Sequence, residues 1–273
     1  MEHSHYVIRG GLQGRERLRV LARVVRPTTI DLFERIGLQP GMACLDIGCG
    51  GGDVTVELAR MVGPTGRVVG FDMDQDKIEM ARREASELKL PWLEFRVLEI
   101  GQVDETAAFD VVYARFVLTH LRDPAGALVW MIRQLRPDGV AIVEDIDFSG
   151  HFCYPDSPSF RRYVELYSQV VQRTGADPYV GKRLPELLLD TGLQKVRMHV
   201  VQPAGFDGEV KLMAPLTMEN IADSVLSHGL ASRQEINRIV NDLYALADDH
   251  RTVMSLPRVV QVWGCRADDS VSN

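Results

Sequence analysis

The sequence predicts an α/β protein in which a mostly parallel β-sheet is covered by helices on both faces. From residue 43 onward, short apolar runs of strand length alternate with stretches that have helical spacing. The turns GPTG at 63–66 and RPDG at 136–139 each lead from a helix into the next strand. Because crossover helices place successive strands in parallel, this alternation indicates a doubly wound sheet.

The first elements follow from hydrophobic spacing. Residues 15–37 carry apolar side chains at helical intervals, and Pro27 is expected to break this helix because proline lacks a backbone N–H. Five strands are expected next, at 43–47, 67–71, 93–98, 109–114 and 140–143. The helices expected between them are 54–61, 76–88 and 125–135.

The pattern changes after Asp147. The elements expected beyond it are helices at about 158–173 and 183–191 and strands at 195–201 and 258–265. About fifty residues separate these two strands, with helical patterns at about 209–227 and 232–248. Such a connection is too long for a hairpin, so we expect a helical insertion that covers a site. The expected divisions are an amino-terminal helical cap (1–40), a core (41–202), a helical lid (203–256) and a last strand with its tail (257–273).

Composition and charge narrow the class of protein. The chain has 273 residues, 45% hydrophobic and 25% charged, which is typical of globular proteins. The net charge is −7 and Lys and Arg are scattered, so nucleic acid is not an expected partner. No apolar run approaches the roughly 20 residues that span a bilayer, and the start lacks a signal-peptide core, so we expect a cytoplasmic protein without a membrane partner. The four cysteines form no CxxC pair, so no metal is expected.

The stretch LDIGCGGG at 45–52 lies between the first expected strand and its helix, where open α/β sheets bind ligands. A dinucleotide-binding turn has the pattern G-x-G-x-x-G/A, and Gly48 and Gly50 fit its first two positions. Asp53 stands in place of the third glycine, where its carboxylate would cap the helix but repel a pyrophosphate. Asp46 adds a second negative charge. These residues favour a ligand with a cationic end and no phosphate.

S-adenosylmethionine fits this requirement, because it carries an ammonium, a sulfonium and an adenosine but no phosphate. At this turn the sequence resembles the class I S-adenosylmethionine-dependent methyltransferase family, whose first motif is a hydrophobic residue followed by D-x-G-x-G-x-G. The resemblance covers about 40–150, and the layout is similar to small-molecule methyltransferases of ubiquinone and menaquinone biosynthesis. It implies a Rossmann-like sheet of seven strands with an antiparallel last strand, and S-adenosylhomocysteine as product.

The resemblance also implies which residues bind the cofactor. Asp72, at a strand end 20 residues beyond Gly52, is expected to bind the ribose hydroxyls, and Met73 to pack on the adenine. Leu98 and Glu99 stand where the family has a Gly-Asp pair, so Glu99 either accepts from the adenine amino group or has no such role. The full expected set is Asp46, Gly48, Cys49, Gly50, Asp72, Met73, Glu99, Ile100, Arg115 and Tyr6.

The amino-terminal segment has two interpretations. Similar enzymes fold this segment over the cofactor, which makes Tyr6 and an arginine such as Arg15 candidates for binding the methionine carboxylate. The alternative is an ordinary exposed helix whose arginines form salt bridges.

Methyl transfer from a sulfonium needs an aligned acceptor and the exclusion of water, and a base only if the acceptor loses a proton. His120, after the fourth strand, and Asp145, after the fifth, are the candidate catalytic residues. His120 is otherwise a packing residue, whereas burial of Asp145 would raise its pKa toward a useful value. His151 and Tyr154 are at most substrate-lining residues.

The sequence therefore predicts a methyltransferase that acts on oxygen or carbon of a small organic acceptor. YARF at 113–116 lacks the Asn/Asp-Pro-Pro-Tyr/Phe motif of amino DNA methyltransferases. One alternative is a catalytically inactive S-adenosylmethionine-binding protein with a regulatory or interaction role. Another is an NAD-linked oxidoreductase, which Asp53 disfavours. A second copy of the chain, joined through the helical insertion, is also considered as a partner.

Overall fold

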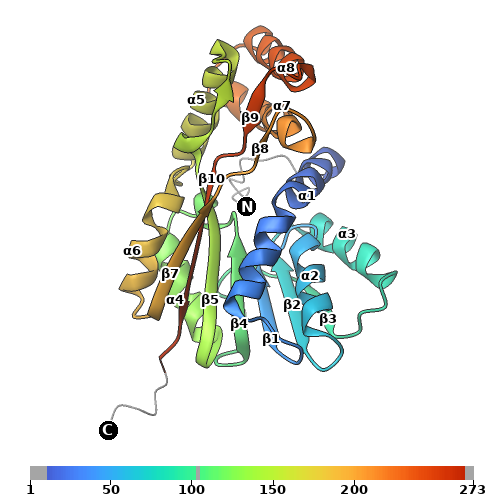
Figure 1. Cartoon of the computed structure of the whole chain (residues 1–273), viewed down its shortest axis with the longest axis vertical. Helices are drawn as coiled ribbons and strands as arrows, with labels where there is room; N and C mark the ends of the chain where they lie inside the picture. The colour runs from blue at the N-terminus through green and yellow to red at the C-terminus, as the bar shows by residue number, and fades with distance from the viewer. Residues whose placement is uncertain (1–10, 103–104, 268–273) are drawn as a thin grey trace.

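The computed structural model describes residues 11–102 and 105–267 of the chain. A seven-stranded sheet has the order β3-β2-β1-β4-β5-β10-β7, in which β10 is antiparallel to both of its neighbours (Figure 1). The pairs β3–β2, β2–β1, β1–β4 and β4–β5 are parallel, which confirms the predicted Rossmann-like fold class. In sheet order the strands are Leu93–Val97, Arg67–Asp72, Ala43–Ile47, Phe109–Arg115, Leu135–Asp147, Arg258–Cys265 and Gln194–Val201.

Two hydrophobic cores lie on opposite faces of this sheet, because successive residues of a strand point to opposite sides. Leu45 and Ile47 of β1 pack with residues of α4 and α6, whereas Cys44 packs with Leu32 and Phe33 of α1. β1 is buried along its whole length, as expected for a central parallel strand. The helices around the sheet are α1 (Gly11–Ile36), α2 (Asp53–Val62), α3 (Gln75–Ser86), α4 (Pro124–Gln134) and α6 (Leu184–Asp190).

Helix α1 is continuous and contains Pro27, so the prediction that this proline breaks the helix is wrong. A proline inside a helix removes one backbone hydrogen bond and costs about 3 kcal/mol or more. Val25, Leu32 and Phe33, on both sides of the proline, are at most 1% exposed. Full burial of such a side chain contributes about 1.5–3 kcal/mol. The burial of these apolar side chains therefore outweighs the free-energy cost of Pro27 within the helix.

Most other elements lie at or within a few residues of their predicted positions, and two features differ. β5 extends over Leu135–Asp147 instead of 140–143, because it stays paired with β10 as far as Asp147. The sequence does not predict the small second sheet, which has the order β6-β9-β8. Its strands are Cys153–Tyr154, Val253–Ser255 and Ala204–Gly205. Two or three residues are too few to show a hydrophobic period.

A layer of three helices stands above the carboxyl ends of the main strands (Figure 1). It consists of α5 (Pro158–Arg173), α7 (Met213–Ser227) and α8 (Arg233–Asp248), which share one core. α7 and α8 correspond to the two helical patterns expected between the last strands. α5 precedes both of those strands, so this helical layer draws on two separate parts of the chain. It faces the edge of the sheet that carries the glycine turn.

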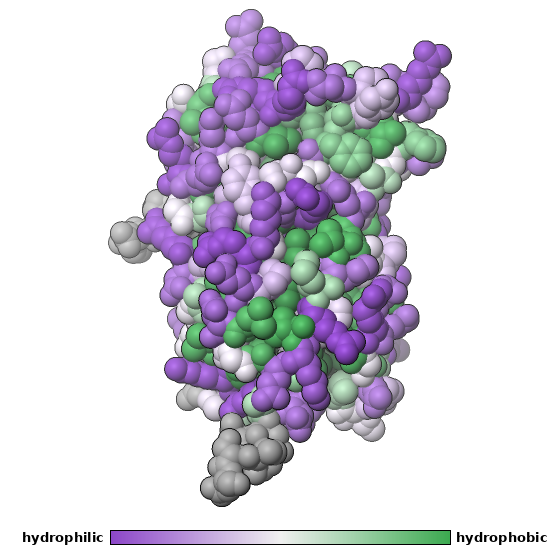
Figure 2. Space-filling model, turned by 60° about the vertical axis from the view of Figure 1, so that its left-hand side comes forward, coloured by the Kyte–Doolittle hydropathy of each residue, from purple (hydrophilic) through white to green (hydrophobic). Residues whose placement is uncertain are grey.

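The surface is mainly polar on the face that Figure 2 shows, and its apolar residues form separate groups. Met198 and Val200, on the sheet-edge strand β7, are among the exposed apolar residues. Within 11–102 and 105–267, none of the helices combines the length and apolar character needed to cross a membrane. The same residues contain no group of three or more His, Cys, Asp or Glu arranged to hold a metal ion.

Candidate active site

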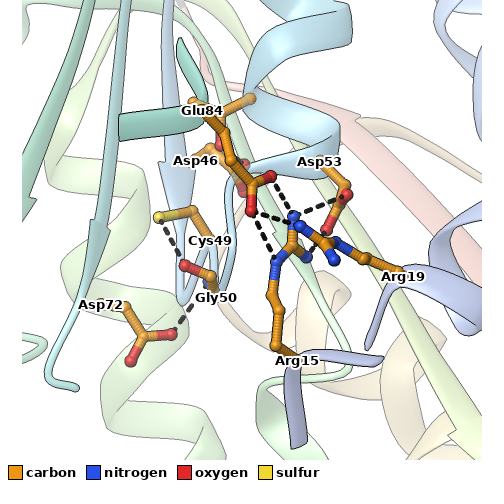
Figure 3. A network of polar contacts seen from close by, with 9 residues as sticks. Arg15, Arg19, Asp46, Cys49, Gly50, Asp53, Asp72 and Glu84 are labelled. Carbon is orange, nitrogen blue, oxygen red and sulfur yellow. Dashed lines mark hydrogen bonds and ion pairs between the residues drawn. The ribbon is translucent and has the colours of Figure 1, made fainter. Parts of the chain in front are cut away.

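The glycine turn joins the end of β1 to the start of α2 (Figure 3). Gly48, Gly50 and Gly52 have φ angles of 62°, 55° and 81°, in the left-handed region that favours glycine. A Cβ atom on Gly48 would lie 2.6 Å from a methyl group of Val117, and one on Gly52 would lie 2.5 Å from the Phe95 ring. The turn therefore requires glycine both for its backbone conformation and for its close packing.

Asp72 ends β2 beside this turn and binds it through the backbone. Its Oδ2 accepts a hydrogen bond from the Gly50 amide at 3.0 Å, and its Oδ1 accepts one from the Asp74 amide at 2.9 Å. A carboxylate oxygen accepts up to two hydrogen bonds. Each oxygen of Asp72 therefore retains capacity for a ligand hydroxyl.

Asp46 lies below the turn, in β1, and is only 2% exposed. Its Oδ2 accepts a hydrogen bond from the Thr55 hydroxyl at 2.7 Å. Burial raises the pKa of the Asp46 carboxyl to about 7, and the Thr55 hydrogen bond and the Arg115 charge partly oppose this rise. Near neutral pH the carboxyl is therefore divided between its neutral and charged forms, and a ligand cation would favour the charged form.

Two adjoining hollows open at this edge of the sheet. The first extends from the glycine turn toward the helical layer, and the second extends along the ends of β2, β3 and β4. The residues that line both hollows are Gly48, Asp72, Lys77, Phe116 and His120. The second hollow is otherwise lined by Phe71, Met73, Asp74, Leu98, Glu99, Ile100, Val117, Leu121, Arg122 and Thr174. The two hollows therefore lie side by side at the glycine turn.

The chain leaves β4 through a strained turn at the junction of the two hollows. Phe116 has a φ of 56°, in the left-handed region, where a bulky residue costs about 1–3 kcal/mol. Its amide donates to the Glu144 carbonyl of β5 at 2.8 Å, which holds this conformation. The next residue, Val117, packs against Gly48. The segment after β4 and the glycine turn thus fix each other's position.

His120 lies in the 3-10 turn Leu118–His120 that follows β4. Burial of its ring lowers the pKa of His120 to about 3, and the charges of Arg17 and Lys77 act in the same direction. The imidazole is therefore neutral near pH 7. A neutral imidazole offers one donor and one acceptor nitrogen to its surroundings.

Asp145 is fully buried in β5 and lines neither hollow. Its carboxylate accepts hydrogen bonds from the Thr119 amide at 3.1 Å and from the Ile146 amide at 2.8 Å. Burial raises its pKa to about 7. Asp145 thus holds the turn after β4 in place, and the structure does not put its carboxylate in the cleft, where the sequence places it.

Arg15 fastens α1 to the glycine turn (Figure 3). Its side chain is 3% exposed and forms ion pairs with Asp53 at 2.5 Å and with Glu84 of α3 at 2.7 Å. A Cβ atom on Gly51 would lie 2.3 Å from the guanidinium, so this close approach also depends on glycine. Glu84 is shared with the more exposed Arg19. Of the two interpretations of this segment, the described residues support salt bridges for Arg15, which is already paired with two carboxylates.

The far wall of the first hollow comes from the helical layer and from the segment after β5, and it is rich in aromatic rings. Phe148 stacks on Tyr167 with ring centroids 3.9 Å apart, and the His151 ring meets the Phe148 ring edge-on at 5.1 Å. Tyr163 also lines this wall. Burial lowers the pKa of His151 to about 3, so its ring is neutral. Tyr154, in contrast, is 70% exposed and lines neither hollow.

The sequence matches the profile of a methyltransferase domain over residues 38–176, about half of the chain. The chain belongs to this methyltransferase domain family. The family expected from the LDIGCGGG motif is therefore confirmed.

Individual relatives match the same part of the chain. An uncharacterized 37.1 kDa protein in a Streptomyces fradiae transposon is 34% identical over 163 residues, which is 59% of this chain and 46% of that protein. The 2-phytyl-1,4-naphtoquinone methyltransferase of Trichormus variabilis is 32% identical over 135 residues, 48% of this chain and 56% of that enzyme. The chain thus spans about half the length of these curated relatives. The crystal structure of a putative methyltransferase from Bacillus halodurans has a TM-score of 0.58 at 16% identity and covers 88% of this chain and 99% of that one, which supports the fold.

Within this methyltransferase domain, the predicted cofactor-binding residues lie in two groups along the hollows. Those that line the first hollow are Asp46, Gly48, Cys49, Gly50, Asp72 and Arg115. Met73, Glu99 and Ile100 line the second. Tyr6 lies outside the described residues. His120 lines both hollows, whereas Asp145 lines neither.

Sequence reasoning missed most of the wall opposite the glycine turn. Arg17 of α1, Tyr163 and Tyr167 of α5 and Thr217 of α7 line the first hollow although they are far apart in the sequence. The aromatic residues of α5 at helical spacing were a signal, but such spacing is equally typical of a buried helix face. Only the packing of α1, α5 and α7 against one another distinguishes the two.

Proposed function

We propose that this chain is an S-adenosylmethionine-dependent methyltransferase that methylates oxygen or carbon of a small organic acceptor. The observation that carries the proposal is the pairing of a tight glycine turn with Asp46 and Asp72 in the lining of two adjoining hollows. The named activity of the Trichormus variabilis relative supports a small-molecule acceptor.

The second hollow suits the adenosine. Asp72 has acceptor capacity for two ribose hydroxyls, since each of its oxygens accepts one backbone hydrogen bond from the described residues. Met73, Leu98 and Ile100 give the hollow apolar sides for the adenine. Glu99 lies at the same hollow and would accept from the adenine amino group.

The first hollow suits the charged methionine end. Asp46 would bind the ammonium, and Gly48 and Gly50 keep the turn free of side chains that would block close approach. When bound, S-adenosylmethionine supplies a methyl group already activated by the positive sulfur. The Asp46 carboxylate would repel a pyrophosphate in the same position, which argues against a dinucleotide.

The contribution of the chain itself is to orient the acceptor and exclude water. The helical layer closes the first hollow from the side opposite the glycine turn. His120 stands where the two hollows meet, and its neutral ring would accept a hydrogen bond from the acceptor. A group with a pKa of about 3 is a weak base, so we propose that His120 positions the acceptor.

The division of the chain into a cap, a core and a helical lid belongs to the same proposal. We assign the acceptor to the space between the glycine turn and the helical layer. In that layer, α7 and α8 come from the lid region 203–256, and α5 comes from the core region 41–202. The cytoplasm is the location that we propose. Action on small molecules and not on nucleic acid agrees with the net charge of −7.

Two measurements test the function. Calorimetric titration with S-adenosylhomocysteine and with NAD separates the two cofactor classes, and we expect binding of the first alone. Transfer of labelled methyl from S-adenosylmethionine to a metabolite extract then separates an enzyme from an inactive binding protein. Tight binding of NAD without binding of S-adenosylhomocysteine would overturn the proposal.

A further inference from the structure

The first hollow contains a buried cation that the cofactor assignment does not use. Arg17 of α1 lines this hollow and is only 8% exposed. Its Nε donates to the Thr217 hydroxyl of α7 at 3.0 Å. A guanidinium carries five N–H donors, and among the described residues the Thr217 hydroxyl accepts one of them.

The other arginines near the start of α1 are paired with acids. Arg15 binds Asp53 and Glu84, Arg19 binds Glu84, and Arg23 binds Glu209. Among residues 11–102 and 105–267, no carboxylate lies within ion-pair distance of Arg17. Burial of a charge without a counter-charge is unfavourable unless a ligand supplies one. The absence of an acid beside Arg17 therefore points to an anionic ligand.

The guanidinium is anchored to the helical layer, because Thr217 belongs to α7. Burial lowers the pKa of His120 and raises that of Tyr163, and the Arg17 charge adds to the first shift and opposes the second. Both side chains line the first hollow together with Arg17. Thr217, its hydrogen-bond partner, also lines the first hollow. Arg17 is thus held by the helical layer, whereas Asp46, which lines the same hollow, is held by Thr55 of α2.

The hollow that Arg17 lines also has an aromatic wall. Phe148, His151 and Tyr167 supply aromatic surfaces, and His151 is neutral because of its burial. Neither ring nitrogen of His151 makes a hydrogen bond of normal geometry with a described residue. A planar molecule with polar substituents matches such a wall, because aromatic rings stack on it and His151 can bind a substituent.

We propose that Arg17 binds an anionic group of the methyl acceptor, and that the acceptor is an aromatic or similarly flat acid. This inference rests on the proposed function, because it takes the hollow beyond the glycine turn to be the acceptor site. The hollow then offers two groups of opposite charge, Asp46 for the cofactor ammonium and Arg17 for the acceptor anion. A cationic acceptor is disfavoured by the same arginine.

The test uses full-length protein saturated with S-adenosylhomocysteine and a matched pair of probes, 2-naphthoate and 2-naphthamide. The probes have similar size and shape, and only the first carries a charge. Because a hydrogen bond to a charged group is stronger than a neutral one, we expect naphthoate to bind about tenfold or more tightly than naphthamide. Calorimetry measures both affinities.

Three variants identify the group responsible. Arg17→Gln is expected to abolish the preference for naphthoate and to change the S-adenosylhomocysteine affinity by less than about threefold. Thr217→Val, which removes the hydroxyl that accepts from Arg17, is expected to reduce the preference in part. Arg35→Gln is the control on the same helix, since Arg35 is exposed and pairs with Asp31 far from the hollow. It is expected to leave both affinities unchanged.

Two outcomes overturn the inference. If the wild-type protein does not prefer naphthoate, or binds neither probe at millimolar concentration, the anion site is wrong whether or not Arg17→Gln folds. If Arg17→Gln weakens S-adenosylhomocysteine about tenfold and retains the probe preference, the guanidinium binds the cofactor carboxylate instead. Failure of the wild-type protein to bind S-adenosylhomocysteine at all would contradict the proposed function, which is a separate result.

Discussion

The Asp72 carboxylate accepts a hydrogen bond from the Gly50 amide at 3.0 Å, so the end of β2 and the glycine turn form one unit. The side chain that would hold the ribose thus also fixes the backbone that would lie against the methionine. Because both are held before any ligand binds, little conformational entropy remains to be lost on binding. Substitution of Asp72 is therefore the most direct test of the cofactor site.

Replacement of Asp72 by Ala is expected to weaken S-adenosylhomocysteine binding by about 1–3 kcal/mol, because two ribose hydroxyls lose their acceptor. Calorimetric titration measures the change. Asp76→Ala, an exposed carboxylate at the start of α3, is the control and is expected to have no effect. An unchanged affinity in Asp72→Ala would refute the ribose assignment.

Gly52→Ala is expected to lower the free energy of unfolding by more than the backbone penalty that alanine has at a positive φ. Gly52 has a φ of 81°, and its added Cβ would lie 2.5 Å from the Phe95 ring. Gly192 has a φ of 83° with no atom within 4 Å of such a Cβ, so Gly192→Ala isolates the conformational penalty of about 1–2 kcal/mol. Urea unfolding of both variants measures the difference. Equal losses of unfolding free energy would show that the Phe95 contact is easily relieved.

Much of the fold was predictable because its strands are short, buried and regularly spaced. β1 and β10 lie where the apolar runs place them, and α5 matches its predicted range of 158–173. The carboxyl end of β5 was not predictable, since Glu144, Asp145 and Asp147 are charged residues that sequence patterns place in loops. They are nevertheless buried in a strand, because partners elsewhere in the chain satisfy them, such as the Gln261 amide that donates to Glu144 at 2.8 Å.

The candidate site was predictable only where its residues are neighbours in the sequence. The glycine turn, Asp46 and Asp72 belong to motifs with fixed spacing around β1 and β2. Arg17 and Thr217 are 200 residues apart, and their hydrogen bond depends on how α1 packs against α7. No local pattern distinguishes Arg17 from the other arginines of α1, so its burial was visible only in the structure.

The Asp46 carboxyl is expected to make S-adenosylhomocysteine binding depend on pH. Its pKa of about 7 without ligand means that the charged form, which binds the ammonium, is lost as pH falls below 7. Affinity is therefore expected to rise between about pH 5 and 7, by up to tenfold per unit, and to level off above 7. Calorimetry across this range measures the slope.

Asp46→Asn is the control for this titration, because its amide oxygen can still accept from Thr55 and carries no charge. Its affinity profile is expected to be flat from pH 5 to 8. The pKa of Asp46 is about 7 in the folded protein and 3.8 in the unfolded chain, so between these pH values the folded protein binds more protons. The free energy of unfolding therefore falls as pH rises from about 4 to 7. The variant is thus expected to gain stability relative to wild type at pH 8. A wild-type affinity that does not vary with pH would contradict the role of Asp46.

Arg15→Gln is expected to loosen α1 from the glycine turn. The side chain of Arg15 is 3% exposed, but Asp53 and Glu84 are 29% and 41% exposed and therefore screened by solvent. We expect a loss of about 1–3 kcal/mol in unfolding free energy, measured by urea titration. Arg35→Gln, whose partner Asp31 is exposed, is expected to lose at most about 0.5 kcal/mol. Equal losses in the two variants would mean that Arg15 does not anchor the helix.

His120 is expected to position the acceptor without carrying a proton in the pH range of activity. Because its pKa is about 3, the rate with the acceptor found by labelled transfer should show no His120 titration between pH 5 and 9. His120→Ala is expected to lower kcat/KM about tenfold through the lost hydrogen bond, and His120→Gln, which keeps a neutral donor and acceptor, is expected to lose less. S-adenosylhomocysteine affinity separates this effect from damage to the cofactor site and is expected to stay within about threefold in both variants. An inflection near pH 6–7 that is present in the wild type and absent from His120→Gln would instead show that the imidazole acts as a base.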